Sequence, residues 1–111
     1  MSGEIVYFQL DVADASRARE FYGPLFGWEF DEGNAEEGFQ IGKEGLPGGV
    51  YGRAPETLLR VYIDVPDIDA AVERVRELDG EAGEVQESGG GGRFAHCRDN
   101  QGVAFSLWQQ G

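Results

Sequence analysis

The stretch "VYIDVPDIDAAVERV", residues 61–75, joins a strand pattern directly to a helix pattern. Its first residues alternate apolar and polar side chains, which is typical of a strand with one buried face. Asp67 follows, a residue type that caps the first free amides of a helix. The apolar positions behind it recur at spacings of three and four and predict one apolar helical stripe, formed by Ile68, Ala71, Val72, Val75 and Leu78. Gly80 should end that helix.

The same pattern occurs 53 residues earlier in the chain. Val6, Phe8 and Leu10 alternate with polar residues, and Asp14 stands where Asp67 stands in the later copy. A second stripe follows, formed by Ala15, Ala18, Tyr22 and Leu25. Because Gly and Pro are poor helix formers, we expect Gly23 and Pro24 to tighten or break the last turn of this helix.

Short strand candidates follow each predicted helix. After the first helix they are residues 28–30, 39–41 and 48–51, and after the second they are residues 93–99 and 102–109, joined by the turn sequence DNQG. The glycine-rich residues 88–92 predict a mobile loop. We therefore expect an α+β fold of two βαβββ modules, about 4–53 and 58–109, within a single domain that covers residues 1–111.

The composition excludes several classes of partner. The chain has 21 acidic and 9 basic residues and a formal net charge of −12, which would repel nucleic acids and anionic membranes. It contains no apolar run long enough to span a bilayer and no recognisable export signal. Cys97 is the only cysteine, so no internal disulfide is possible. These features predict a cytoplasmic protein.

Three segments in this order resemble the vicinal oxygen chelate superfamily, which includes glyoxalases, bleomycin resistance proteins and dioxygenases: FYGPLFGWEF at 21–30, VYIDVPDIDAAVERV at 61–75, and RDNQGVAFSLWQ at 98–109. The resemblance implies a curved mixed sheet around a concave cavity (the glyoxalase-like fold) and a homodimer. It also implies that Phe21, Leu25 and Phe26 pack beneath the sheet as part of the core.

Members of this superfamily usually hold a divalent metal at four strand positions. By resemblance these positions correspond to Tyr7, Arg60, Ser106 and a residue within 49–51. None of them is His, Glu or Asp, and a guanidinium carries a permanent positive charge and no acceptor. We therefore expect no metal site of the family type and no other cofactor.

Strand alternation predicts which side chains share the face opposite the helices. Alternation places Tyr7, Gln9, Arg60, Tyr62, Ser106 and Trp108 on that face. The candidate ligand-binding set adds Tyr51, from the strand position that the resemblance implies, and His96, the only histidine. Arg60 could bind an anionic or oxygen-rich group of a ligand that has a flat apolar body. An open alternative is that Arg60 pairs with Asp64, Asp11 or another of the many carboxylates and that the cavity is collapsed.

The leading hypothesis is metal-independent binding of a small organic molecule, in the manner of the bleomycin resistance proteins. One alternative is a metal-dependent lyase or dioxygenase with displaced ligands, recruiting His96 and a glutamate such as Glu44 or Glu84. Another is a non-catalytic interaction subunit. His96 is the only histidine, and Cys97, the next residue on the same strand, should point to the opposite face.

Overall fold

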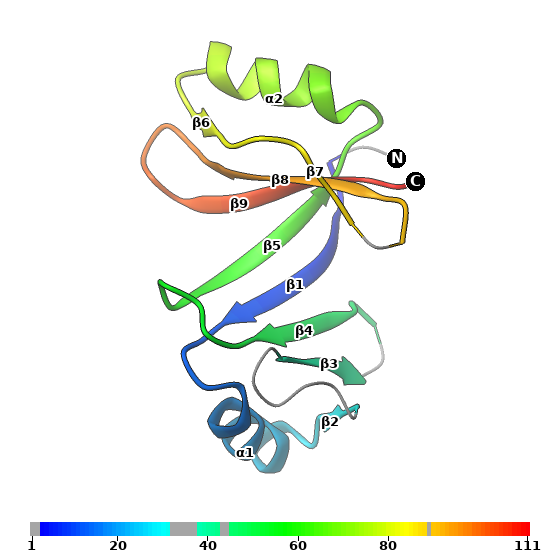
Figure 1. The fold of residues 1–111 in the computed structure, drawn as a ribbon, viewed down its shortest axis with the longest axis vertical. Helices are drawn as coiled ribbons and strands as arrows, with labels where there is room; N and C mark the ends of the chain where they lie inside the picture. Colours follow the sequence, from blue (N-terminus) through cyan, green and yellow to red (C-terminus); the bar gives the residue numbers. More distant parts are fainter. Residues whose placement is uncertain (1–2, 32–37, 43–44, 89) are drawn as a thin grey trace. The chain divides into compact units, whose positions relative to one another are not determined.

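The structure is a computed structural model that describes residues 3–31, 38–42, 45–88 and 90–111. Residue contacts divide the described chain into two compact units: a first unit, Tyr7–Arg60, and a second unit, Met1–Val6 with Val61–Gly111. Each unit contains one helix and a group of strands (Figure 1). No helix among the described residues is long and apolar enough to cross a membrane.

The first unit follows a strand-helix-three-strand plan. Its elements are β1 (Ile5–Asp11), α1 (Ala15–Phe26), β2 (Glu29–Phe30), β3 (Gly38–Gly42) and β4 (Gly48–Tyr51). The strands lie in the order β2-β3-β4-β1, and β1 pairs with β4 in parallel while the other pairs are antiparallel. Because a parallel pair needs a long crossover connection, α1 is carried onto one face of these strands.

The second unit repeats this plan. Its elements are β5 (Leu58–Asp64), α2 (Ile68–Glu77), β6 (Glu81–Ala82), β7 (Gln86–Glu87), β8 (Arg93–Arg98) and β9 (Ala104–Gln109). The first three residues of β5, which include Arg60, are counted with the first unit. The strands lie in the order β5-β9-β8-β6, with β7 also paired to β8, and β5 pairs with β9 in parallel. The predicted α+β fold with mixed βαβββ strand pairing is confirmed.

Both helices begin at the predicted aspartates. Asp14 Oδ1 accepts a hydrogen bond from the Arg17 amide at 3.1 Å, and Asp67 Oδ1 accepts one from the Ala70 amide at 3.2 Å. Each aspartate has an extended backbone and satisfies an amide that has no partner within its helix. The repeat seen in the sequence is therefore a repeat of two capped helices.

The core of the second unit lies between α2 and two strands. Ile68 and Val72 on α2 pack against residues of β8 and β9, namely Ala95, Cys97 and Leu107. Leu78, the last residue of the predicted stripe, is exposed. Asp79 takes the left-handed conformation after the helix, with φ 69°, and the Gly80 amide then donates to the Val75 carbonyl at 2.9 Å.

Helix α1 continues through the Gly and Pro that were expected to disturb its last turn. Pro24 lies inside α1, which ends only at Gly27, where φ is 73° and the amide donates to the Gly23 carbonyl at 2.7 Å. Pro24 has no amide hydrogen to donate to the carbonyl four residues earlier, but the bond from the Gly27 amide to the Gly23 carbonyl still closes the last turn. The expected break is therefore wrong.

The expectation that Phe21, Leu25 and Phe26 belong to the core is also wrong. These three side chains are 60%, 58% and 56% exposed. The space against β1 is taken instead by Trp28, whose ring lies 5.9 Å from that of the buried Phe8 and 5.8 Å from that of Tyr22, centroid to centroid. Once Trp28 occupies this space, the other large side chains of the segment remain on the surface.

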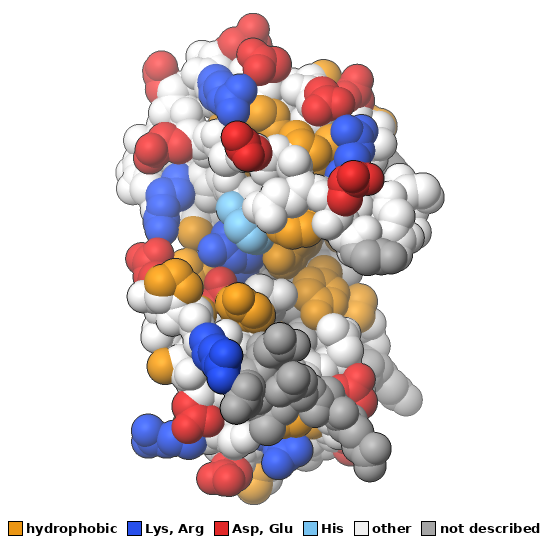
Figure 2. All heavy atoms as spheres, in the orientation of Figure 1, with side chains coloured by type: hydrophobic (Ala, Val, Ile, Leu, Met, Phe, Trp, Pro, Cys, Tyr) orange, Lys and Arg blue, Asp and Glu red, His pale blue; other side chains and the backbone are white. Residues whose placement is uncertain are grey.

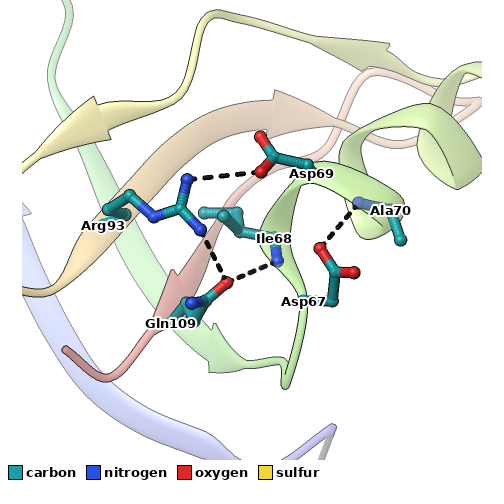
Figure 3. Close-up of polar contacts among 6 residues, drawn as sticks. All are labelled: Asp67, Ile68, Asp69, Ala70, Arg93 and Gln109. Carbon is teal, nitrogen blue, oxygen red and sulfur yellow. Dashed lines mark hydrogen bonds and ion pairs between the residues drawn. The ribbon is translucent and has the colours of Figure 1, made fainter.

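A glutamine from the last strand fixes the start of α2, as Figure 3 shows. Gln109 Oε1 accepts from the Ile68 amide at 2.8 Å and from Arg93 Nη2 at 3.2 Å, while Arg93 Nη1 lies 3.3 Å from Asp69 Oδ2. The side chain of Gln109 thus joins β9, β8 and the first turn of α2. A hydrogen bond that satisfies a partly buried amide is costly to remove.

We predict that Gln109→Ala lowers the free energy of unfolding by about 1.5 kcal/mol, because the Ile68 amide loses its acceptor. Gln109→Glu keeps an acceptor at this position and should recover most of that loss. The measurement is urea unfolding followed by circular dichroism, with the exposed turn variant Gln101→Ala as the control. Equal stabilities for Gln109→Ala and Gln101→Ala would show that this contact contributes nothing.

Candidate functional site

The predicted site residues divide between the two units. The first unit holds Tyr7, Gln9, Tyr51 and Arg60, and the second unit holds Tyr62, His96, Ser106 and Trp108.

In the second unit, strand register places the predicted residues in rows across the sheet. Tyr62 is opposite Ser106, and Ser106 is opposite His96, so the three form one row over β5, β9 and β8. The next row contains Trp108 opposite Phe94. Because side chains alternate along each strand, these rows point away from the core beneath α2.

We call this surface the aromatic face and define it as Tyr62, Phe94, His96, Ser106 and Trp108. The Phe94 and His96 rings have centroids 5.2 Å apart, and Tyr62 lies 6.4 Å from Phe94 and 6.3 Å from His96, with both pairs close to edge-to-face. Sequence reasoning missed Phe94, although it lies two residues before His96 on the same strand and could have been found from that alternation. The rings of Tyr62, Phe94 and His96 thus form one cluster in which each ring contacts the other two.

His96 and Ser106 form the polar part of the aromatic face. His96 Nδ1 lies 2.7 Å from Ser106 Oγ, within hydrogen-bond distance. Ser106 has no exposed surface, whereas His96 is half-buried, and Figure 2 shows histidine atoms at the molecular surface. Cys97 points into the core on the other side, as strand alternation predicts.

The ring of Trp108 is held close to a glycine of the hairpin that enters β8. A Cβ atom on Gly92 would lie only 2.4 Å from two carbons of the Trp108 ring. The Ser88 amide donates to the Gly92 carbonyl at 2.7 Å, which closes the connection between β7 and β8. Because glycine has no side chain, the backbone at residue 92 can lie against the Trp108 ring. A larger residue at this position would clash with that ring.

The first unit carries a buried ion pair rather than a ligand-ready arginine. Asp11 is 7% exposed and accepts from Gln9 Nε2 at 2.7 Å and from Arg60 Nε at 3.2 Å. Asp11 is one of the carboxylates that the sequence left open as a partner of Arg60. Asp11 was absent from the predicted site, because a carboxylate at the end of a strand gives no sign of burial in the sequence alone.

Tyr7 reaches across β4 to the neighbouring strand. Its hydroxyl lies 3.5 Å from Gln40 Oε1, and it passes so close to Gly49 that a Cβ there would be 2.3 Å from the hydroxyl oxygen. Burial raises the pKa of Tyr7, and the hydrogen bond with Gln40 opposes this effect. Tyr7 therefore remains a neutral hydroxyl at neutral pH, while Tyr51, also in this unit, is exposed.

The donor set does not fit the divalent metal that the superfamily resemblance implies. The described residues contain no group of three or more His, Cys, Asp or Glu side chains that could hold a metal ion. Asp11, the buried carboxylate of the first unit, is already neutralised by Arg60. A cation added beside Arg60 would be repelled.

His96 with Glu44 or Glu84 was the alternative set of metal ligands. Glu44 lies outside the described residues. Glu84 is exposed, and within the described chain it belongs to no potential ligand cluster with His96. We therefore derive no chemistry through a metal.

Comparisons with known proteins agree with this fold. A sequence model described as a glyoxalase-like domain matches residues 7–108. The chain is 30% identical over 117 residues to proteins named CFP32 from Mycobacterium bovis and Mycobacterium tuberculosis, provisionally described as glyoxylases. The match covers 93% of this chain and 44% of those proteins, so the chain spans less than half the length of these curated relatives.

Solved structures have a similar fold at lower sequence identity. A glyoxalase/bleomycin resistance protein/dioxygenase superfamily member from Vibrio splendidus has a TM-score of 0.71 and 19% identity, over 98% of this chain and 100% of that chain. Methylmalonyl-CoA epimerase from Mycobacterium tuberculosis has a TM-score of 0.66 and 16% identity, over 98% and 88%. At these identities the likeness concerns the fold.

We predict that Asp11→Leu lowers the free energy of unfolding by about 3 kcal/mol, because it leaves the buried charge of Arg60 without its carboxylate. The double variant Asp11→Leu/Arg60→Met removes both charges and should be more stable than the single variant. Urea unfolding of the two variants and the unaltered protein measures this difference. A single variant as stable as the double one would contradict the role given to the pair.

Proposed function

The chain belongs to the glyoxalase-like domain family, within the vicinal oxygen chelate superfamily, and on this basis we propose that it binds a small organic molecule without a metal ion. The ligand lies on the aromatic face of the second unit. The observation that carries this proposal is the ring cluster of Tyr62, Phe94 and His96, which leaves a half-buried histidine among apolar walls. Aromatic walls with a few placed polar groups are the usual composition of a small-molecule site.

The metal-independent part of the proposal rests on the residue types at the family positions. Tyr7, Arg60 and Ser106 supply a phenol, a guanidinium and a buried hydroxyl. None of these is a good ligand for a divalent ion at neutral pH. Family membership shows the fold, and these residue types support the proposal that the chain binds its ligand without a metal.

Ligand-observed NMR against a set of small aromatic compounds tests this function. We expect compounds that bind with the same affinity with and without EDTA, and Trp108→Ala should weaken them at least tenfold because it removes a wall of the aromatic face. The matched control is Leu59→Ala, which truncates an exposed apolar residue elsewhere. Binding that is lost in EDTA, or retained in Trp108→Ala, would overturn the proposal.

We also propose that the chain forms a homodimer through α1. Phe21, Leu25 and Phe26 are each more than half exposed, and residues 21–28 contain no charged side chain. The net charge is −12, so two copies repel each other over most of their surface. This repulsion is weaker where the contact is made by a segment without charged side chains. Large apolar side chains of this kind form the centre of stable interfaces, which bury about 800 Å² on each partner.

Sedimentation velocity tests the dimer. We expect a dimer for the unaltered protein and a monomer for Leu25→Glu, because the new charge would be buried at the interface. Val103→Glu makes the same change in charge at another exposed apolar residue and should remain dimeric. A monomeric unaltered protein, or a dimeric Leu25→Glu variant, would refute this interface.

A further inference from the structure

A cleft of about 380 Å³ lies at the end of α2 in the second unit. It is lined by residues of the helix end and of the β8–β9 hairpin, namely Val75, Leu78, Gly80, Asp99, Asn100 and Phe105. Figure 1 shows that the C-terminal end of α2 and this hairpin lie at the same end of the unit. The cleft is on the helix side of the strands, because Phe105 packs against the core beneath α2. It is therefore separate from the aromatic face, to which the next residue, Ser106, belongs.

The walls of the cleft are apolar. Val75 and Phe105 pack against the core of the second unit, and each is half-buried. Leu78 follows the last residue of α2 and is 56% exposed. Together these three side chains give a ligand an apolar surface on which to pack.

Gly80 brings the chain back against β8 after the helix. A Cβ atom on this residue would lie 2.8 Å from the Arg98 carbonyl oxygen and 2.9 Å from Val75 Cγ1. A larger residue would therefore force the backbone away from the strand. Because residue 80 is glycine, the backbone after Leu78 can stay against β8.

The hairpin turn fixes one carboxylate at the cleft. Asp99 Oδ1 accepts hydrogen bonds from the Gln101 amide at 2.8 Å and from the Val103 amide at 2.9 Å. The hydrogen bond from Val103, followed by that from Gln101, lowers the pKa of Asp99, so this side chain is negatively charged at neutral pH. A carboxylate can accept about four hydrogen bonds, so Asp99 can also bind a donor of a ligand.

The charges around the cleft favour a cation. Asp99 is the one charged side chain among the described residues that line it. The arginines in the last turn of α2 pair with glutamates of the same helix: Arg74 Nη1 lies 3.2 Å from Glu77 Oε1, and Arg76 Nη1 lies 3.0 Å from Glu73 Oε1. The carbonyl end of the helix adds negative partial charge. A positively charged ligand therefore complements this end of the unit.

Arg98, the residue before Asp99, reaches the turn from the other side of the sheet. Its side chain is on the face of β8 opposite Cys97, which points into the core. Arg98 Nη1 donates to the Gly102 carbonyl at 2.9 Å. The guanidinium therefore contacts the backbone of the turn and does not line the cleft.

We propose that this cleft binds a small organic cation with an apolar chain, of the class of the primary alkylamines. The chain packs against Val75, Leu78 and Phe105, and the ammonium group donates a hydrogen bond to the Asp99 carboxylate. The volume suits a small molecule, since ligand sites usually measure about 300–1,000 Å³. A protein partner would need a larger surface, usually about 20–30 residues on each side. This is a second site, independent of the ligand proposed for the aromatic face.

The probe is n-hexylammonium, with neutral n-hexanol and anionic hexanoate as counterparts of similar length. We expect hexylammonium to bind about threefold more tightly than hexanol, and hexanoate to bind most weakly, because a solvent-accessible ion pair contributes modestly. In a ¹H–¹⁵N NMR titration, hexylammonium should shift the amide signals of residues 78–80 and 99–103, which surround the cleft. The indole signal of Trp108, which reports on the aromatic face, should stay unchanged.

Variants separate the charge from the apolar walls. Asp99→Asn keeps an acceptor for the two amides of the turn and removes the charge, so it should bind hexylammonium and hexanol equally. Glu87→Gln makes the same change in charge at the other end of β8 and should keep the preference. Leu78→Ala should weaken both probes by about threefold because it removes a wall. Val103→Ala truncates an exposed apolar residue outside the lining and should bind both probes normally.

Added salt gives a test that needs no variant. An ion pair that is open to solvent is screened by salt, so the preference for hexylammonium over hexanol should disappear at molar sodium chloride. The binding of hexanol should not weaken under the same conditions. A preference that is unchanged by salt would contradict the role given to the Asp99 carboxylate.

Several results would overturn the proposal. These are equal binding of hexylammonium and hexanol by the unaltered protein, an unchanged preference in Asp99→Asn, and shifts at the Trp108 indole in place of the cleft amides. If Nα-acetyl-lysine methylamide binds more tightly than hexylammonium, the cleft takes a lysine side chain of a protein, and the proposal of a free amine is wrong. If none of the probes binds, this site is refuted, while the function proposed for the aromatic face is unaffected.

Discussion

The packing of α2 on β8 and β9 is the interaction on which the second unit depends. Ile68 and Val72 bury Ala95, Cys97 and Leu107, and these strand residues alternate with Phe94, His96, Ser106 and Trp108. A slip of one residue in either strand would turn the core residues outward and the aromatic face inward. The same hydrophobic contacts that stabilise the unit therefore also fix which side chains face away from the helix.

Each unit also contains a buried polar residue with specific partners. Ser106 is paired with His96 in the second unit, and Asp11 is paired with Gln9 and Arg60 in the first. Burying such groups is unfavourable unless they are hydrogen-bonded, and a buried ion pair rarely stabilises a protein more than apolar residues of the same size would. Stability alone does not explain why these residues occupy sheet positions.

Membership of the glyoxalase-like family gives this chain its scaffold, and the residues at the strand positions where the resemblance places metal ligands are not the usual ligand types. Tyrosine, arginine and serine stand where the resemblance places metal ligands, and the described residues hold no other donor cluster. The exposed aromatic residues of α1 show a second departure from expectation. In an acidic protein, an exposed apolar segment without charged side chains, residues 21–28, supports the homodimer proposed above.

The sequence by itself determined both helices, the longer strands, both aspartate caps and the division of those strands into two faces. These follow from periods of two and 3.6 residues and from caps that act within one turn. Only the tertiary structure decided that Arg60 pairs with Asp11 across 49 residues and that Gln109 binds the Ile68 amide across 41. It also decided that Trp28, and not Phe21 or Leu25, packs beside Phe8. Local periodicity shows which side chains point toward a given face of an element. The volume that can be buried against that face is limited, so only the packing of distant segments determines which of these side chains are buried.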